Sequence, residues 1–402
     1  MHNGMVKVVT GIRRSGKSFL LFKIFRRYLR ELGVGDDHVI AIALDQRQNR
    51  RYRDPDAILQ YIEALITDGS PYYIMIDEVQ MLAEFEEVIN SLLHLENADV
   101  YVTGSNSKFL SKDVITEFRG RGDEVHVYPL SFREYMQVYE GDVYHCWSDY
   151  VVYGGLPLAA LMRSEARKVQ YLSSLFAETY LKDIIERNHI VKTQELEDLI
   201  NVLASSIGSL TNANKIAATY KTKLHSSLSA NTIRQYIDYL EDAYIVSAAQ
   251  RYDVKGRKYI GALVKYYFED VGLRNARLGF RQIEETHLME NVVYNELRGR
   301  GYSVDVGIVE LRRRNAEGAS VRCQREIDFV ANLGSRRYYI QSAFSIPDMD
   351  KWEQEKASLC GVKDAFKKIV LVKDVRAVSR DESGIMTMSI YDFLLNEDSL
   401  EL

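Results

Sequence analysis

Val8-Val9-Thr10-Gly11-Ile12-Arg13-Arg14-Ser15-Gly16-Lys17-Ser18 has the spacing G-x-x-x-x-G-K-S of a phosphate-binding loop. The β-branched residues ahead of Gly11 predict a strand, and the apolar residues after Lys17 repeat at the spacing of an amphipathic helix. These apolar residues are Phe19, Leu20, Phe22, Ile24, Phe25, Tyr28, Leu29 and Leu32. A strand, a loop and a helix in this order are the context that such a motif requires. The sequence therefore predicts a P-loop α/β fold that binds a nucleoside triphosphate.

Each part of this loop has an expected role at the phosphates. The backbone N–H groups and the positive end of the helix dipole would surround the phosphate oxygens. Lys17 would reach the β- and γ-phosphates, and the hydroxyl of Ser18 would ligate Mg²⁺. The expected ligands are ATP and Mg²⁺. The expected nucleotide-binding residues are Gly11, Ile12, Arg13, Arg14, Ser15, Gly16, Lys17, Ser18 and Phe19.

A second apolar run, Pro71-Tyr72-Tyr73-Ile74-Met75-Ile76-Asp77-Glu78, ends in two adjacent acids. A continuous apolar run is typical of a buried parallel strand, and functional residues sit at the carboxyl ends of such strands. Asp77 would hold Mg²⁺ directly or through water, and Glu78 would polarise the attacking water. Such a pair is typical of P-loop proteins that hydrolyse the nucleotide instead of only binding it.

Two further candidates concern the γ-phosphate. A predicted strand, residues 99–103, runs into Gly104-Ser105-Asn106-Ser107. In ATPases with an extra strand between the loop strand and the acidic strand, a polar residue here senses the γ-phosphate. Thr103, Ser105 and Asn106 are all candidates, and we take Asn106 as the catalytic one. Arg121, in a glycine-rich turn, is the preferred arginine for stabilising the transferred phosphoryl group, in cis or from a neighbouring subunit.

The composition limits the class of protein. The chain has 402 residues, a net charge of −5, 46% hydrophobic residues and 27% charged residues. It is long enough for several globular domains, and as a whole it is no strongly basic nucleic-acid binder. Cys146, Cys323 and Cys360 show neither zinc-site nor disulfide spacing. No apolar run approaches the ~18–20 residues that span a bilayer, and no signal peptide is visible. We expect a cytoplasmic protein without a membrane partner.

The order of the expected elements divides the chain into four domains. Residues 1–130 are expected to form a P-loop ATPase core, and residues 131–195 a small helical lid interrupted at Tyr153-Gly154-Gly155-Leu156-Pro157. Residues 196–270 are expected to form a winged-helix domain. Residues 271–402 are expected to form an α/β domain with a restriction-endonuclease-like fold. With five prolines and no low-complexity stretch, the domains should be joined without long linkers.

The winged-helix prediction depends on three helices followed by a basic hairpin. The expected helices cover residues 195–206 and 214–220 and a segment that starts at Ser229 or Asn231, and two strands follow at residues 244–249 and 263–268. The third helix has one apolar face, formed by Ile233, Tyr236, Ile237 and Leu240. Such a module binds DNA through its third helix and wing. Here that helix offers Arg234 beside Asp238, Glu241 and Asp242, which matches phosphates poorly. DNA binding and a purely structural role are equally open.

The last domain carries residues that could form a metal site. Glu290 is expected on a helix, Asp328 on a strand and Gln341 on the next strand. Nuclease folds of this kind hold Mg²⁺ on two such acids and use a lysine on the last strand to activate water or balance charge. Here Gln341 replaces the second acid and Ala343 stands where the lysine belongs. Lys351 or Lys356 could substitute, but a catalytically inactive domain is favoured over an active nuclease.

Several motifs together resemble the prokaryotic AAA-type ATPases that carry a C-terminal domain of unknown function. Besides the loop they are Ile-Asp-Glu-Val-Gln (76–80), Thr-Gly-Ser-Asn-Ser (103–107), Arg-Gly-Arg (119–121), Pro-Leu-Ser-Phe-Arg-Glu-Tyr (129–135), Tyr-Gly-Gly-Leu-Pro (153–157), Arg-Glu-Ile-Asp-Phe-Val (325–330) and Tyr-Tyr-Ile-Gln-Ser-Ala (338–343). The resemblance covers nearly the whole chain and implies an AAA-type core, a winged helix and a nuclease-like tail. Members usually have a segment ahead of the first strand that helps to enclose the adenine, so base selectivity stays open.

Three functions are compatible with these residues. The first is a Mg²⁺-dependent ATP hydrolase that couples turnover to a conformational change in its C-terminal domains. The second is an ATP-gated switch that binds DNA or protein and hydrolyses slowly. The third, less favoured, is a Mg²⁺-dependent nuclease that uses Glu290 and Asp328. DNA as a partner of the winged helix and assembly into a homo-oligomer both stay open.

Overall fold

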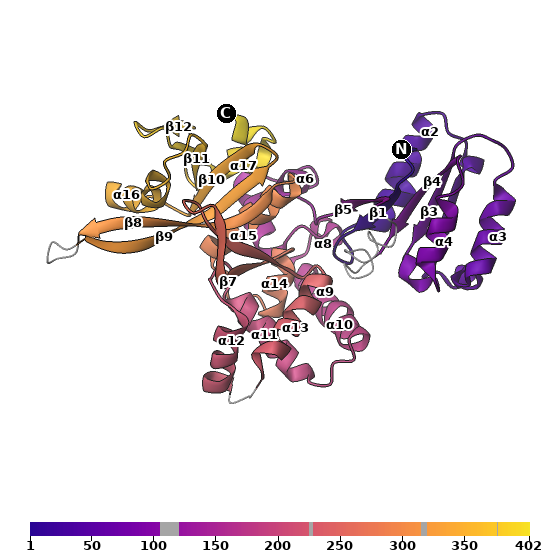
Figure 1. Cartoon of the computed structure of the whole chain (residues 1–402), viewed down its shortest axis with the longest axis horizontal. Helices are drawn as coiled ribbons and strands as arrows, with labels where there is room; N and C mark the ends of the chain where they lie inside the picture. The colour runs from indigo at the N-terminus through magenta and orange to yellow at the C-terminus, as the bar shows by residue number, and fades with distance from the viewer. Residues whose placement is uncertain (105–119, 225–227, 315–319, 376) are drawn as a thin grey trace. The chain divides into compact units, whose positions relative to one another are not determined.

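The computed structural model describes the chain except for residues 105–119, 225–227, 315–319 and 376 (Figure 1). The chain divides into two compact units. The first unit comprises Met1–Pro129 and Asp242–Tyr244, and the second comprises Leu130–Glu241 and Ile245–Leu402. The boundary that the sequence suggests near residue 130 stays a prediction. The finer boundaries near residues 195 and 270 stay predictions.

The first unit is built on a parallel five-stranded sheet. Its strand order is β2-β3-β4-β1-β5, and the pairings in it are parallel. The strands are β1 (Val6–Thr10), β2 (Val39–Ala43), β3 (Tyr72–Asp77), β4 (Ala98–Thr103) and β5 (Gly122–His126). The strands expected before the loop, at Asp77 and at Thr103 are therefore present. Strand β4 lies between the loop strand β1 and the acidic strand β3, as the sequence predicts.

The side chains of β3 are buried on both faces of this sheet. Ile74 and Ile76 belong to one hydrophobic cluster, whereas Tyr73 and Met75 belong to another on the opposite face. Because successive side chains of a strand point to opposite faces, a strand covered on both sides is apolar throughout. This is why the run from Tyr72 to Ile76 shows no polar alternation.

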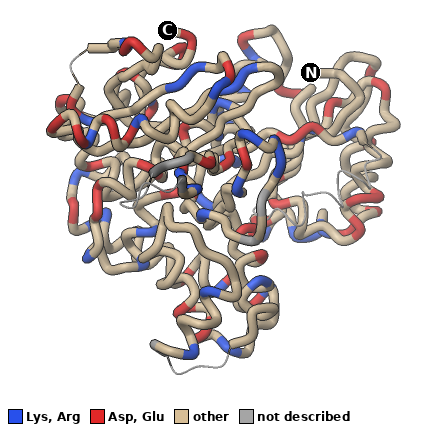
Figure 2. The backbone as a smooth tube through the Cα atoms, turned by 60° about the vertical axis from the view of Figure 1, so that its left-hand side comes forward, with Lys and Arg blue, Asp and Glu red and all other residues tan. Residues whose placement is uncertain are grey.

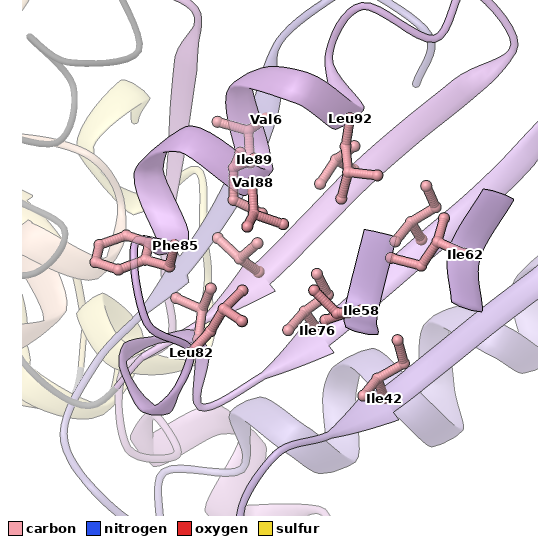
Figure 3. Close-up of a cluster of buried hydrophobic side chains, with 14 of the residues drawn as sticks. Val6, Ile42, Ile58, Ile62, Ile76, Leu82, Phe85, Val88, Ile89 and Leu92 are labelled. Carbon is pink, nitrogen blue, oxygen red and sulfur yellow. The ribbon is translucent and has the colours of Figure 1, made fainter. Parts of the chain in front are cut away.

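Helices cover the two faces. On one face lie α3 (Pro55–Leu65) and α4 (Phe85–Leu92), whose apolar residues pack on the sheet in the cluster of Figure 3. Helix α3 begins with Asp54, whose side chain accepts a hydrogen bond from Ala57 N–H, and with Pro55 in its first turn. The other face is covered by the continuous helix that follows the loop: α1 (Lys17–Phe19), the π-helical η1 (Leu20–Phe25) and α2 (Arg26–Glu31). Short 3₁₀ turns complete the unit: η2 (Asp36–His38), η3 (Arg47–Arg53) and η4 (Val79–Met81).

The second unit begins with helices. They are α6 (Phe132–Met136), α7 (Val143–Tyr153), α8 (Pro157–Ala160), α9 (Glu165–Leu175), the π-helical η6 (Phe176–Leu181), α10 (Lys182–Arg187), α11 (Thr193–Ser205), α12 (Ala213–Thr219), the π-helical η7 (Tyr220–Leu224) and α13 (Ala230–Asp242). Helices α11, α12 and α13 lie where three helices are expected. The predicted apolar face of α13 is buried.

An eight-stranded sheet fills the rest of the second unit, in the order β12-β13-β11-β10-β9-β8-β6-β7. The strands are β6 (Val246–Asp253), β7 (Lys258–Phe268), β8 (Ser303–Arg314), β9 (Ser320–Leu333), β10 (Arg336–Ala343), β11 (Lys367–Val372), β12 (Ser379–Arg380) and β13 (Met386–Ser389). Its helices are α14 (Val271–Arg277), α15 (Glu285–Gly299), α16 (Met349–Cys360) and α17 (Ile390–Leu395), followed by the 3₁₀ turn η8 (Ser399–Glu401). Strand β6 pairs with β8. The hairpin predicted as a wing is therefore part of the C-terminal sheet.

A buried carboxylate joins two distant segments of this unit. Asp270 accepts hydrogen bonds from Gly155 N–H at 2.7 Å and from Leu273 N–H at 2.8 Å. A Cβ at Gly154 would lie 2.3 Å from Asp270 Oδ1, so the glycine allows this close approach. Asp270 thereby fixes the Tyr-Gly-Gly-Leu-Pro segment to the start of α14. Burial raises the pKa of Asp270 to about 6.

Candidate nucleotide-binding site

The loop between β1 and α1 needs glycine at its first position. Gly11 has a φ of 128°, and a Cβ there would lie 2.3 Å from the backbone oxygen of Val127. Gly16 and Arg14 also have positive φ values, of 107° and 65°. These left-handed residues turn the backbone sharply between the strand and the helix. The conformation of the loop therefore explains why the motif has glycines at these positions.

The ammonium of Lys17 lies inside the curve of its own loop. Its side chain is buried, and Nζ donates to Gly11 O at 2.8 Å and to Ile12 O at 2.9 Å. Ser15 is buried as well, and within the described residues its Oγ has no hydrogen-bond partner. Phosphate oxygens are stronger acceptors for an ammonium than amide carbonyls are. The loop thus presents a cation, a hydroxyl and backbone N–H groups to an anion.

Three oxygen-bearing side chains meet at the carboxyl ends of β3 and β4. Ser18 Oγ donates to Asp77 Oδ1 at 2.9 Å, and Thr103 Oγ1 donates to the same carboxylate oxygen. Asp77 is only 4% exposed. Hydroxyl and carboxylate oxygens are the ligands that Mg²⁺ prefers. The residues predicted to bind metal, Ser18 and Asp77, are therefore adjacent, and their chemistry fits this ion.

Glu78 follows Asp77 in an unusual backbone conformation. Its φ is 55°, a left-handed value that costs a non-glycine residue on the order of 1 kcal/mol. Its N–H donates to Thr103 Oγ1 at 3.1 Å, and its carboxylate accepts a hydrogen bond from Gln80. The turn sets the Glu78 side chain beyond the strand end, next to Asp77. Gln80 has no place in our sequence-based assignment, although it lies in the same Ile-Asp-Glu-Val-Gln motif.

The remaining predicted residues differ in where they lie. Ser105 and Asn106 are outside the described residues, so Thr103 is the sensor candidate whose contacts are known. The backbone oxygen of Arg121 accepts from Val6 N–H at 2.8 Å. Arg121 is therefore beside the amino ends of β1 and β5, whereas Lys17 follows the carboxyl end of β1. Five strand residues, roughly 16 Å, separate the two ends.

The structure thus does not bring Arg121 to the loop of its own chain, and a role in a neighbouring subunit's site stays a prediction. Of the residues expected around the phosphates, Phe19 has a side chain that is 63% exposed. Only its backbone N–H is suited to contact a phosphate. Ile12 is fully buried, and it anchors the loop in the unit.

Comparison with known proteins agrees with this geometry. Residues 3–136 match a family model described as AAA domain, and residues 145–284 match one described as Domain of unknown function (DUF8612). An uncharacterized protein of Haemophilus influenzae is 33% identical over 396 residues, which are 97% of this chain and 94% of that protein. This chain belongs to the same family. Its first unit is a P-loop AAA-type ATPase domain, as the motifs indicate.

More distant similarities were also found. The uncharacterized protein MJ1544 of Methanocaldococcus jannaschii is 24% identical over 375 residues, 89% of this chain and 79% of that protein. Among solved structures, the Aeropyrum pernix ORC2 protein in its ADP form is 13% identical with a TM-score of 0.35, covering 70% of this chain and 88% of that one. A likeness this weak says nothing about activity. Across the described residues, no helix is long and apolar enough to cross a membrane.

Proposed function

We propose that this protein is a Mg²⁺-dependent ATP hydrolase whose turnover changes the conformation of its C-terminal part. The observation that carries the proposal is the meeting of Ser18, Asp77 and Thr103 beside the loop that holds Lys17. Lys17 and the loop N–H groups suit the phosphates, and the three oxygens suit the ion. Glu78 follows Asp77 directly at the end of β3.

Each residue of the site is suited to a different role in hydrolysis. The ammonium of Lys17 exchanges the carbonyls of Gly11 and Ile12 for β- and γ-phosphate oxygens when nucleotide binds. Ser18 and Asp77 would hold Mg²⁺, and the ion would neutralise part of the negative charge of the phosphates. Glu78 orients a water molecule toward the γ-phosphorus and accepts a proton from it as the general base. Gln80, which donates to the Glu78 carboxylate, restricts the direction in which this carboxylate points.

Thr103 is suited to transmit the state of the site. Its hydroxyl donates to Asp77 and accepts from the backbone N–H of Glu78. A change in the ligands of Asp77 therefore acts on the position of Glu78 through a single hydroxyl.

Phosphate release separates this proposal from simple nucleotide binding. The full chain is compared with Lys17→Ala and Glu78→Gln, and with the exposed controls Lys23→Ala and Glu87→Gln. We expect Lys17→Ala to lose binding and turnover. Glu78→Gln should keep nucleotide binding but lose about 10²–10⁴-fold in turnover, the usual contribution of a general base. Equal phosphate release from all five proteins would refute the proposal.

A second function, an ATP-gated switch that binds nucleic acid, is favoured by one observation. Lys255, Arg257 and Lys258 are exposed at the turn between β6 and β7. Figure 2 shows the lysine and arginine positions of the chain in blue. Lys255 and Arg257 also line a recess of about 370 Å³ together with Lys363. The turn is therefore a better candidate for phosphate contacts than α13, whose exposed side bears acids.

Salt dependence tests this second function. Each phosphate that a basic residue neutralises adds about 0.9 to the slope of log affinity against log salt. We expect the triple variant Lys255→Ala, Arg257→Ala, Lys258→Ala to bind duplex DNA with a slope lower by about 2–3. A control that removes three exposed positive charges elsewhere, at Arg163, Arg167 and Lys192, should keep the wild-type slope. Identical slopes in all three proteins, or binding that ATP does not change, would exclude the switch.

A further inference from the structure

A buried lysine lies among three carboxylates in the second unit. Lys265, on β7, is 3% exposed. Its Nζ lies 2.8 Å from Glu290 Oε1 on α15, 2.7 Å from Glu326 Oε1 on β9 and 3.6 Å from Asp328 Oδ1 on β9. Helix α15 and strand β9 thus place three carboxyl groups around one nitrogen atom of strand β7. Lys265 and Glu326 are absent from the sequence-based site.

Neighbouring groups hold the carboxylates in place. Tyr267 OH donates to Glu290 Oε1 at 2.6 Å, and the N–H of Ser342 donates to Asp328 Oδ2 at 2.9 Å. A Cβ on Gly208 would lie 3.0 Å from Glu290 Oε1, so the backbone packs closely there too. The carboxylates are therefore oriented by contacts other than the lysine. They should keep much of their arrangement when the lysine side chain is removed.

The charges of the cluster do not cancel. One ammonium faces three carboxyl groups. Burial alone would lower the pKa of Lys265, but the carboxylates raise it above its ordinary value. Lys265 is consequently charged at neutral pH. The three carboxyl groups outnumber this single positive charge. A divalent cation would satisfy three carboxylates better than an ammonium does.

The sequence leaves open a Mg²⁺ site on Glu290, Asp328 and Gln341, and it favours a catalytically inactive domain. The structure brings Glu290 and Asp328 together, but the point on which they converge is Lys265 Nζ. In the part of the chain that is described, no group of three or more His, Cys, Asp and Glu side chains is arranged to hold a metal ion. An ammonium and a divalent cation exclude each other from one position by size and by charge. The residues present therefore do not fit a metal while Lys265 is in place.

Gln341 is not brought to this cluster. It pairs with Val370 in the parallel β10–β11 ladder, and Val370 belongs to the hydrophobic cluster that packs against α16. Phe329, the neighbour of Asp328, instead packs against Tyr294 of α15, the helix that carries Glu290. The side chain of Gln341 therefore lies on the face of the sheet that α16 covers, away from Glu290.

We infer that the ammonium of Lys265 permanently takes the position of a divalent cation among Glu290, Glu326 and Asp328. The cluster is a lysine-filled carboxylate site that ties β7 to α15 and β9. Removal of the lysine side chain converts it into a site for Mg²⁺ or Mn²⁺. Glu326, whose side chain is 32% exposed, marks the side from which an ion would enter.

Mn²⁺ binding by the full chain tests this inference. Every protein carries Asp77→Asn, which removes a metal ligand of the nucleotide site, and no nucleotide is added. Lys265→Ala is compared with the parent, with Lys258→Ala as an exposed lysine on the same strand, and with Lys265→Ala/Glu290→Gln/Asp328→Asn. Mn²⁺ uptake is measured by electron paramagnetic resonance, and unfolding temperature is measured with and without Mn²⁺.

We expect Lys265→Ala to bind one more Mn²⁺ per chain than the parent, and its unfolding temperature to rise by several degrees with the ion. The parent, Lys258→Ala and the triple variant should show neither change. A folded Lys265→Ala protein without extra Mn²⁺ would overturn the inference. So would Mn²⁺ uptake by the parent that Glu290→Gln abolishes, because the lysine would then not exclude the metal.

Without the ammonium, repulsion among the three carboxylates opposes folding of Lys265→Ala in the absence of metal. A second variant, Lys265→Met/Glu326→Gln, keeps the volume of the side chain and removes one negative charge. Refolding of either variant with Mn²⁺, but not with Na⁺ at equal ionic strength, supports the inference. Refolding to the same extent in both salts contradicts it.

Discussion

Ser18 Oγ donates a hydrogen bond to Asp77 Oδ1 at 2.9 Å, although 59 residues separate them in the sequence. Ser18 stands in the first turn after the loop, and Asp77 ends the strand two places away in the sheet. The parallel order of the sheet brings them together, because the carboxyl ends of parallel strands share one edge. Thr103, from the strand between them, donates to the same carboxylate oxygen. This edge holds every group that the proposed hydrolysis uses.

Replacement of Thr103 by valine tests the link between Asp77 and Glu78. Valine keeps the shape but removes the donor to Asp77 and the acceptor for Glu78 N–H. A buried polar group left without its partner costs about 1–3 kcal/mol. We expect turnover to fall about 10- to 100-fold while nucleotide affinity stays within about threefold. Thr103→Ser keeps the hydroxyl and should retain turnover. Equal turnover of the valine and serine variants would show that the hydroxyl has no such role.

Gly11 and Gly33 offer a matched pair for the steric argument. Both have positive φ, 128° and 86°, but a Cβ at Gly11 meets Val127 O whereas a Cβ at Gly33 meets nothing within 4 Å. The left-handed backbone costs either alanine variant about 1–2 kcal/mol. Only Gly11→Ala must also displace the loop. We expect Gly11→Ala to lose nucleotide binding in a fluorescent-nucleotide titration and Gly33→Ala to keep it. Loss of binding in both would attribute the effect to general destabilisation.

The raised pKa of Asp270 should make the stability of the folded chain depend on pH. The pKa of this carboxyl group is raised to about 6 in the folded chain, so the folded state holds this proton more tightly than the unfolded state does. The corresponding stability is complete below about pH 4 and is lost as the pH rises through 6, on the order of 3 kcal/mol in total.

Urea unfolding at pH 5 and pH 8 should therefore show a smaller pH effect in Asp270→Asn than in the wild type. The exposed acid Asp350, replaced by asparagine, serves as the control and should behave like the wild type. An unchanged pH effect in Asp270→Asn would assign the effect to other groups, of which Asp328 is the first candidate, because its pKa is also raised.

The sequence predicts the nucleotide site far better than it predicts the second cluster. Lys17, Ser18 and Asp77 belong to contiguous motifs whose spacing already implies where strands end, so their meeting follows from a parallel sheet. Lys265 belongs to no motif, and Glu326 lies in the Arg-Glu-Ile-Asp-Phe-Val segment (325–330), which gives no sign of a lysine from β7. Their meeting depends on the register of β7 and β9 and on the packing of α15, which no local pattern of residues determines. The wing hairpin illustrates the same limit: its two strands are visible in the sequence, but its pairing with β8 is not.

Arg121 is expected to act only through a second copy of the chain. It lies beside the amino ends of β1 and β5, away from Lys17. Turnover by Arg121→Ala should therefore equal that of the wild type at concentrations where sedimentation shows a monomer. If the protein assembles and gains activity, mixing Arg121→Ala with Lys17→Ala should restore part of the lost turnover, since each supplies what the other lacks. A loss of turnover in dilute, monomeric Arg121→Ala would instead require a contact within one chain.

The lysine-filled cluster also predicts that the wild-type protein does not cleave DNA. A nuclease of the expected type needs a divalent ion on Glu290 and Asp328, and Lys265 Nζ lies at that position. Supercoiled plasmid incubated with the full chain in Mg²⁺ or Mn²⁺, with and without ATP, should remain supercoiled. Asp328→Asn, prepared in parallel, identifies contaminating nuclease, because cleavage that persists in this variant cannot come from the cluster. Nicking by the wild type that disappears in Asp328→Asn would mean that the ion displaces the ammonium, and that the C-terminal unit is an enzyme after all.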